Sequence, residues 1–193
     1  MPRPRSFNPD EVLQIATDLF WEKGYFNASV DELVRQSGVA KYGIYGTFGT
    51  KRELFKKALQ HYAAERHRDI QAPIRRAEAA LPEIQEFFSK ALDMITGDDR
   101  RRGCLMVNTG LELGLRDDEF KNFVRDFFDE TESVVAACLD RAVASKQIDP
   151  GGDTPALAAY LVNEFRTMLM LAGSDCPKSQ IQAHLEIALR ALE

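Results

Sequence analysis

Apolar residues recur at helical spacing along almost the whole chain. The first stretch repeats them at i, i+3, i+4, i+7 and i+8, as Val12, Ile15, Ala16, Leu19 and Phe20. Asn8 is placed to cap this helix, Pro9 suits its first position, and Gly24 is expected to end it. No segment alternates apolar and polar residues as a half-buried strand would. The pattern therefore predicts an all-α protein.

The same spacing predicts further helices. Thr50 begins a long one that is expected to end near Gln71, before Pro73. Five more are predicted to begin at or close to Leu81, Gly103, Asp117, Thr154 and Pro177. With two short helices before Thr50, the total is about nine.

Those two short helices are separated by a glycine. Ser29 can cap the first of them, with Glu32 at the reciprocal position of a capping box. Gly38 stands where a left-handed turn residue is needed, and the second short helix is predicted over residues 40–47. Helix, glycine turn and second helix form the layout of a helix-turn-helix, whose second helix enters the DNA major groove.

Charge supports nucleic-acid binding only locally. The 193 residues carry a net charge of −5, so the chain as a whole is not a basic protein. Between Arg35 and Lys57, however, six cations face one Glu, which gives +6 − 1 = +5. The cations are Arg35, Lys41, Lys51, Arg52, Lys56 and Lys57. Arg3 and Arg5 lie in a Pro-rich N-terminus that fits either a minor-groove arm or a solvated tail.

Several classes of protein are not indicated. The polar N-terminus predicts no signal peptide, and no apolar run approaches the roughly 18 residues of a membrane span. The cysteines lack paired spacing, and the histidines His61, His67 and His184 are scattered, so we expect no metal site and a reduced cytoplasmic protein. We find no cofactor motif and no catalytic constellation, and predict that the protein is not an enzyme.

An ordered series of residue types carries a family resemblance. It consists of residues 20–25 (FWEKGY), 29–33 (SVDEL), 38–48 (GVAKYGIYGTF) and 51–54 (KREL). On these residues the chain resembles the TetR family of one-component transcriptional regulators. The resemblance covers roughly the first third of the chain. It implies a DNA-binding domain over 1–53 and an effector-binding and dimerisation domain over 54–193.

The resemblance implies roles for individual residues at a double-stranded, palindromic operator. Base edges are expected to face Lys41, Tyr42 and Gly43, and either phosphates or bases to face Tyr45 and Thr47. Ser29 and Lys51 are expected to hold phosphates at helix N-termini, where the helix dipole favours anions. Tyr45 has the alternative reading of an apolar wedge between helices. Ala40 departs from the family's usual Ser or Thr, and the operator sequence is expected to differ accordingly.

The resemblance also implies a homodimeric repressor released by a small-molecule effector. The expected dimer interface, a four-helix bundle of two copies, uses Leu157, Leu161, Phe165, Ile181, Leu185 and Leu189. The expected effector pocket uses Cys104, Asn108, Glu112, Phe123, Phe127, Phe165 and Met168. For both sets the alternative is that the apolar residues only fill the protomer's own core.

Two further alternatives stay open from sequence. The cations at 100–102 precede Cys104 and favour a lowered thiol pKa, which would suit a redox or electrophile sensor of the same fold. The opposing reading makes Cys104 a small buried hydrophobe. A helical adaptor that does not bind DNA is the alternative from a different class.

Overall fold

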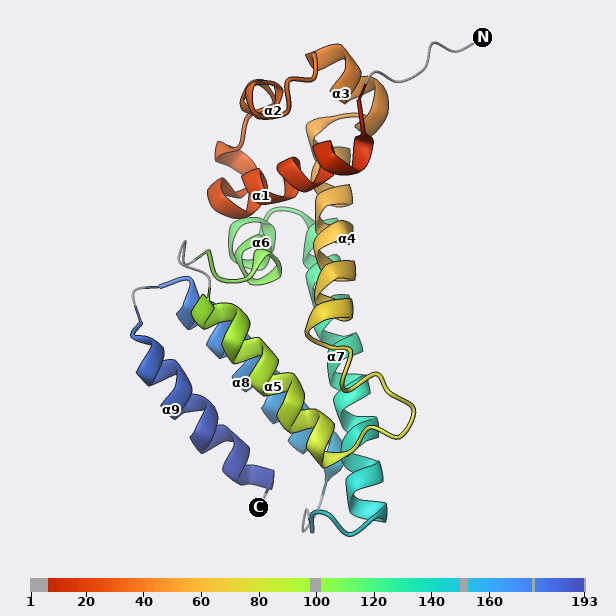
Figure 1. Ribbon diagram of the computed structural model, residues 1–193, viewed down its shortest axis with the longest axis vertical. Helices are drawn as coiled ribbons and strands as arrows, with labels where there is room; N and C mark the ends of the chain where they lie inside the picture. The colour runs from red at the N-terminus through yellow and green to blue at the C-terminus, as the bar shows by residue number, and fades with distance from the viewer. Residues whose placement is uncertain (1–6, 98–101, 150–152, 175, 193) are drawn as a thin grey trace.

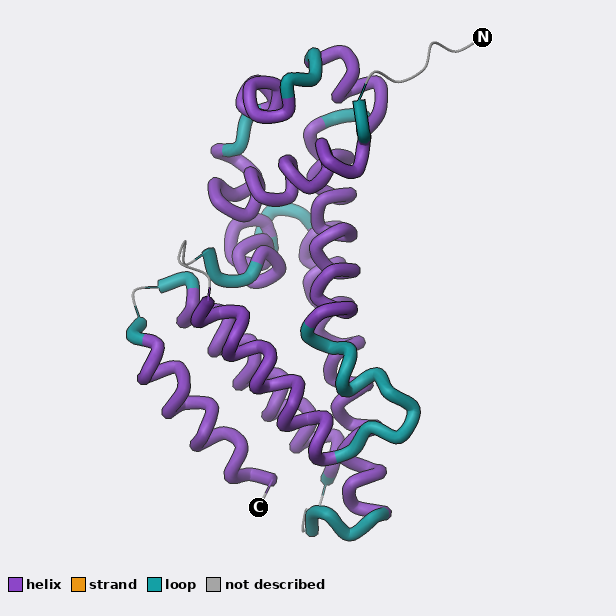
Figure 2. The backbone as a smooth tube through the Cα atoms, viewed as in Figure 1, coloured by secondary structure: helices purple, strands orange, loops and turns teal. Residues whose placement is uncertain are grey.

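The computed structural model describes residues 7–97, 102–149, 153–174 and 176–192. Within them it contains nine α-helices and no strand, which confirms the all-α prediction (Figures 1 and 2). The helices are α1 (Pro9–Asn27), α2 (Val30–Ser37), α3 (Lys41–Phe48), α4 (Lys51–Asp69), α5 (Leu81–Gly97), α6 (Leu105–Leu113), α7 (Asp118–Ala144), α8 (Thr154–Ala172) and α9 (Lys178–Leu189). A single 3₁₀ turn, Arg190–Leu192, follows α9.

Capping residues set the helix boundaries largely as the sequence predicts. Thr50 and Glu53 form both hydrogen bonds of a capping box at the start of α4. Ser29 accepts a hydrogen bond from the Glu32 backbone, but the Glu32 side chain pairs with Lys23 at 2.5 Å, so the second half of that capping box is absent. The helix α4 also ends at Asp69, slightly before the predicted end.

The first three helices form a compact N-terminal head at one end of the molecule (Figure 1). Its core is made of apolar faces that come together from all three helices, namely Val12, Ala16, Leu19, Leu33, Ile44 and Phe48. Burial of these faces stabilises helices that are too short to persist alone, since α2 and α3 have eight residues each. The head therefore presents α3 on a rigid support.

The helix α4 leaves the head and runs along α7 (Figure 1). The Phe55 ring lies at the junction, with its centroid 4.8 Å from that of Phe20 and 5.1 Å from that of Phe120. Phe55 is 1% exposed, so this aromatic cluster is part of the core. It joins α1 of the head, α4 and the start of α7.

The remaining helices form the C-terminal part. The helices α5, α8 and α9 lie beside one another, and α5 and α8 pack against α7 (Figure 1). Their shared core includes the fully buried Phe87, Phe88, Leu161 and Met168. In the described residues, no helix is long and apolar enough to cross a membrane.

Candidate nucleic-acid interface

The exposed side of α3 carries most of the predicted DNA-facing residues. Tyr42 is 90% exposed and Tyr45 is 41% exposed, while Ile44 and Phe48 on the opposite side are buried. Lys41 is also exposed, at the first position of α3. Tyr45 is therefore not buried as an apolar wedge. The structure brings Lys41, Tyr42 and Tyr45 together on one accessible face.

Gly43 and Thr47 are placed less openly. A Cβ atom added to Gly43 would come within 3.2 Å of the Phe7 ring and of Val39, so glycine at this position allows the chain before α1 to pack on α3. Thr47 is half-buried, and its carbonyl accepts a long hydrogen bond of 3.4 Å from Lys57. Contacts of these two residues with DNA stay predictions.

Ser29 and Lys51 lie on either side of a small hollow between α1, α2 and α4. Both stand at helix starts: Ser29 caps α2, and Lys51 is the first residue of α4. The Lys51 ammonium donates to the Phe26 carbonyl at 3.3 Å and lies 4.8 Å from the centre of the Tyr25 ring. Partial burial lowers the pKa of Lys51. Two N-termini and one cation thus converge, an arrangement that suits a phosphate.

The local positive charge is smaller than the sequence count indicates. Arg52 hydrogen-bonds Asp117 and Glu119 of the α7 start, and Lys56 binds the same Glu119 at 2.6 Å. Lys41 binds Asp31 at 2.8 Å, and this bond raises the Lys41 pKa. Three of the six cations therefore have carboxylate partners. The Lys41 pair is exposed on both sides, so a phosphate can replace Asp31 at little cost.

Arg3 and Arg5, predicted as a minor-groove arm or a solvated tail, lie outside the described residues. The described chain begins at Phe7, next to α3.

Glu112 connects the C-terminal part to the head, which the sequence did not predict. The helix α1 breaks at Gly24, where φ is 75° and ψ is 174°. The carboxylate of Glu112 on α6 accepts hydrogen bonds from the Tyr25 and Phe26 amides just after this break, both at 2.8 Å. A side chain on Gly24 would meet this carboxylate at 2.6 Å. Glu112 thus has backbone partners in the head and does not point into a pocket.

Asn108 is likewise occupied, since its amide donates to the Arg102 carbonyl at 2.9 Å. Both residues thus find partners within the chain, and their place in the effector pocket stays a prediction. Sequence spacing placed them on one helix face, but it gave no sign of partners elsewhere in the chain.

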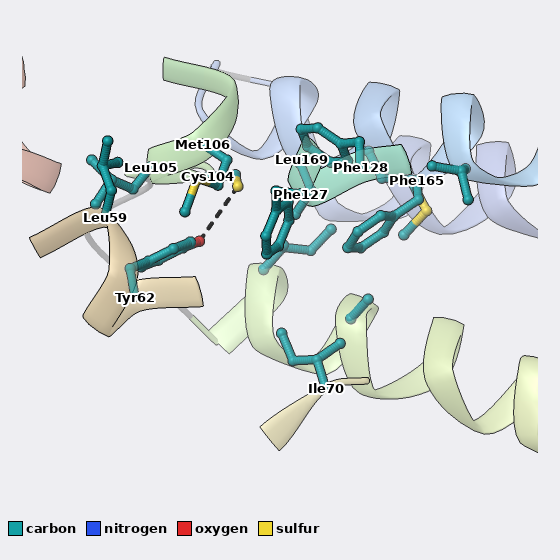
Figure 3. Packing of buried hydrophobic residues seen from close by; sticks show 14 of the residues in the cluster. Leu59, Tyr62, Ile70, Cys104, Leu105, Met106, Phe127, Phe128, Phe165 and Leu169 are labelled. Atoms are coloured by element: carbon teal, nitrogen blue, oxygen red, sulfur yellow. Dashed lines mark hydrogen bonds between the residues drawn. The ribbon is translucent and has the colours of Figure 1, made fainter. Parts of the chain in front are cut away.

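Cys104 lies in the core beside the end of α4. The Tyr62 hydroxyl donates to its sulfur at 3.4 Å, and both side chains are almost completely buried (Figure 3). Burial raises the pKa of the Cys104 thiol, so the prediction of a lowered pKa is wrong. Arg102 contacts the Trp21 ring at 3.7 Å and binds Asp18 at 2.9 Å. The cations 100 and 101 lie outside the described residues.

A small closed cavity lies next to this pair. Its volume is about 10 Å³, enough for about one water molecule. Of the predicted effector residues, Cys104, Phe127 and Phe165 border it, together with Tyr62, Arg66, Ile70, Gln71, Met94 and Leu169. Phe123 and Met168 do not. A larger open groove of about 570 Å³ lies elsewhere, between α6, α7 and α8.

The predicted dimer residues pack mainly inside the protomer. Leu161, Phe165, Ile181 and Leu185 are each at most 5% exposed, while Leu157 and Leu189 are half-buried. The large apolar side chains exposed on α8 and α9 are Tyr160, Met170 and Ile187. The protomer core and a helical interface both use apolar residues at helical spacing, so the sequence pattern did not separate them.

Family models match both parts of the chain. Residues 12–58 match the bacterial regulatory proteins of the tetR family, and residues 80–182, more than half of the chain, match the tetracyclin repressor-like C-terminal domain. The chain belongs to the TetR family. It is a transcriptional regulator with an N-terminal helix-turn-helix, as the resemblance implied.

Individual relatives agree with this assignment. An uncharacterised HTH-type transcriptional regulator of Bacillus subtilis, YezE, is 25% identical over 195 residues, and the match covers 100% of both chains. The HTH-type transcriptional repressor ComR of Escherichia coli is 28% identical over 82% of this chain and 76% of its own. A cysteine mutant of the TetR-family regulator CifR, solved with a 26-base-pair double-stranded operator DNA, has a TM-score of 0.87 at 27% identity, over 99% of this chain and 100% of its own.

Proposed function

We propose that this protein is a cytoplasmic, homodimeric repressor that binds a two-fold operator through α3 and is released when a small molecule enters its C-terminal core. The observation that carries the proposal is the outward face of α3. A tyrosine that is 90% exposed stands there beside an exposed lysine, on a short helix whose other face is buried. The major groove accommodates such a helix, and lysine and tyrosine can both donate hydrogen bonds to base edges and phosphates.

The roles follow from position. Lys41, Tyr42 and Gly43 stand at the front of α3 and meet base edges. Tyr45 and Thr47, further along α3, meet phosphates or bases. Ser29 and Lys51 hold phosphate oxygens at the starts of α2 and α4, where the helix dipoles favour anions. The operator complex of CifR, a protein of the same fold, supports this docking mode.

A dimer is required because one short helix reads too few base pairs. Recognition helices about 34 Å apart, one DNA turn, or multiples of that distance, match a two-fold operator. We place the interface on the outward faces of α8 and α9, which expose Tyr160, Met170 and Ile187. Leu157 and Leu189 lie at its edges, whereas the buried members of the predicted set support these helices from within.

Release is a two-state change. An effector that separates the side chains around the small cavity moves α4, which forms part of the cavity wall and carries Lys51 at its other end. The spacing of the two recognition helices then changes, and both can no longer dock together.

The test is operator binding as a function of salt, with a duplex found by footprinting upstream of the protein's own gene. We expect Lys51→Ala and Tyr45→Ala each to weaken binding by about tenfold or more, and Lys51→Ala to lower the salt slope by about one. Lys90→Ala on α5 is the matched control and should bind normally. If Lys51→Ala and Tyr45→Ala both left operator affinity unchanged, this docking mode would be contradicted.

A further inference from the structure

Arg66 is a half-buried cation that forms one long ion pair, with Glu65, and has no hydrogen bond to an oxygen atom of the described residues. It lies near the end of α4 and borders the small cavity, and its side chain is 17% exposed. Its Nε atom is buried and has no hydrogen-bond partner. One terminal nitrogen faces the sulfur of Met94, which is a weak acceptor, and the other lies 3.9 Å from a Glu65 oxygen, beyond hydrogen-bond distance.

Its remaining neighbours are aromatic rings. The guanidinium carbon lies 5.0 Å from the centre of the Tyr62 ring and 5.8 Å from that of Trp21. Rings lessen the cost of burying a cation but leave its N–H donors unused. A guanidinium carries five such donors in a fork that matches a carboxylate. The donors of Arg66 that the described residues leave unused could therefore bind an anion.

We propose that the effector of this protein is an organic carboxylate with an apolar body, held at its carboxylate by Arg66. This inference rests on the proposed function. Among the described residues, Arg66 is the only charged one that borders the cavity, so it matches a single negative charge better than a dianionic phosphate. The apolar body is indicated by Phe127, Phe165 and Leu169, which border the same cavity and lie near one another in the core (Figure 3).

A second donor is available beside Arg66. The Tyr62 hydroxyl donates to the Cys104 sulfur, a weak acceptor, and burial raises the Tyr62 pKa well above its usual value, which keeps the hydroxyl protonated. Rotation toward a carboxylate oxygen would exchange this bond for a charge-assisted one, which is stronger. Arg66 and Tyr62 are one helical turn apart on α4, so both pull on the same helix.

The ligand must open its own space, because the cavity holds about 10 Å³. Met94 is the flexible side chain at the cavity and is the one that can move most readily. Displacing it frees the Arg66 nitrogen that it covers. Ligand binding and the movement of α4 are then the same event, and carboxylate binding opposes operator binding by linkage.

The experiment uses three acids and their uncharged amides of nearly equal shape: butyrate, octanoate and benzoate against butyramide, octanamide and benzamide. Each is added to the full-length protein at fixed pH and ionic strength. Thermal shift reports binding, and fluorescence anisotropy of labelled operator reports release. We expect at least one acid to raise the melting temperature and to lower operator affinity by about tenfold or more, with no effect of its amide.

The variants separate a binding role from a structural one. Arg66→Met should remove both responses, and Arg66→Lys, which keeps the charge, should retain part of them. Arg68→Met is the matched control, since Arg68 on the same helix is 69% exposed and pairs with Asp69. If Arg66→Met is poorly folded by circular dichroism, Arg66→Gln replaces it.

The proposal is overturned if none of the acids shifts the melting temperature of the wild-type protein. It is also overturned if the amides act on wild type as strongly as the acids do, or if Arg66→Met responds to the acids as strongly as wild type does. Operator affinity without any ligand is measured first for every variant. Failure of wild type to bind operator contradicts the proposed function, whereas the thermal shift tests carboxylate binding independently of DNA.

Discussion

The two ends of α4 carry the same residue type in opposite situations. At the start of the helix, Arg52 binds Asp117 and Glu119, and its guanidinium lies 4.7 Å from the centre of the Phe120 ring. Near the end, Arg66 also lies among aromatic rings, but no oxygen of the part of the chain that the structure describes is within hydrogen-bond distance of its guanidinium. Both arginines have aromatic neighbours, so what separates a structural arginine from one available to a ligand is whether carboxylate oxygens accept its hydrogen bonds.

This difference explains how one helix can serve two purposes. Its first half is fixed to α7 and to the head by charges and by the rings around Phe55. Its second half ends beside a cavity with an unsatisfied cation. A displacement at the cavity is therefore passed to the head through a fixed junction, and the following substitutions test the two ends separately.

The largest effect is expected at the fixed junction. Phe55→Ala removes a ring that is 1% exposed and contacts both the head and α7, and we expect a loss of about 3–5 kcal/mol in the free energy of unfolding. Urea denaturation measures it. Phe26→Ala, at a position 52% exposed, is the control. A loss at Phe55 no greater than at Phe26 would show that the junction is not fixed by packing.

Glu112→Gln should have the next largest effect. The single amide oxygen of glutamine can accept from only one of the two backbone amides, and the other then faces an NH2 donor, so we expect a loss of about 1–2 kcal/mol in the free energy of unfolding. Operator affinity should fall as well, because the same segment contacts Lys51. Glu22→Gln, on the exposed side of α1, is the matched control. Equal results for both variants would remove the role assigned to Glu112.

Arg66→Met is expected to change stability in the opposite direction. Replacing a poorly partnered buried charge by an apolar side chain should stabilise the protein by about 1 kcal/mol, a gain often found where a functional group is removed. A higher melting temperature without ligand is the expected result. A fall would indicate that Arg66 has a structural role like that of Arg52.

The smallest effect is expected for Arg52→Gln. Its bond to Glu119 is exposed and its bond to Asp117 is half-buried, so salt screens both at least in part. Arg52 lowers the Asp117 pKa, and Lys56 and then Arg52 lower that of Glu119. The contribution of these ion pairs to the free energy of unfolding is therefore complete above the ordinary carboxylate pKa of about 4. It is lost as the pH falls through the lowered pKa values of the two carboxylates in the folded protein. Melting temperatures of variant and wild type should differ at neutral pH and converge in acid or high salt. A constant difference would exclude an electrostatic origin.

Local features of the fold could be predicted from the sequence. The capping box at Thr50, the break at Gly24 and the buried faces of the helices each depend on residues within a few positions of one another. The outward position of Tyr42 and Tyr45 on α3 could be predicted in the same way, because the nearby apolar residues Ile44 and Phe48 identify the inner face of the helix.

Contacts between distant parts of the chain could not be predicted in this way. Glu112 is 87 residues from Tyr25, and Arg52 is 65 from Asp117, and nothing in the sequence pairs them. Arg66 resembled any cation near a helix end, and only the packed structure shows that its Nε atom is buried without a hydrogen-bond partner. Four of the predicted dimer residues, Leu161, Phe165, Ile181 and Leu185, also have apolar partners inside the protomer, and these come from other helices, so the sequence did not reveal them.

Hydroxyl-radical footprinting on the DNA upstream of the protein's own gene shows directly whether a dimer docks its two α3 helices on a two-fold operator. We expect two protected patches related by a two-fold axis, with centres separated by about one helical turn or a multiple of it, and loss of both patches in Tyr42→Ala. A single unpaired patch, no protection, or a footprint of equal strength for Tyr42→Ala would contradict it.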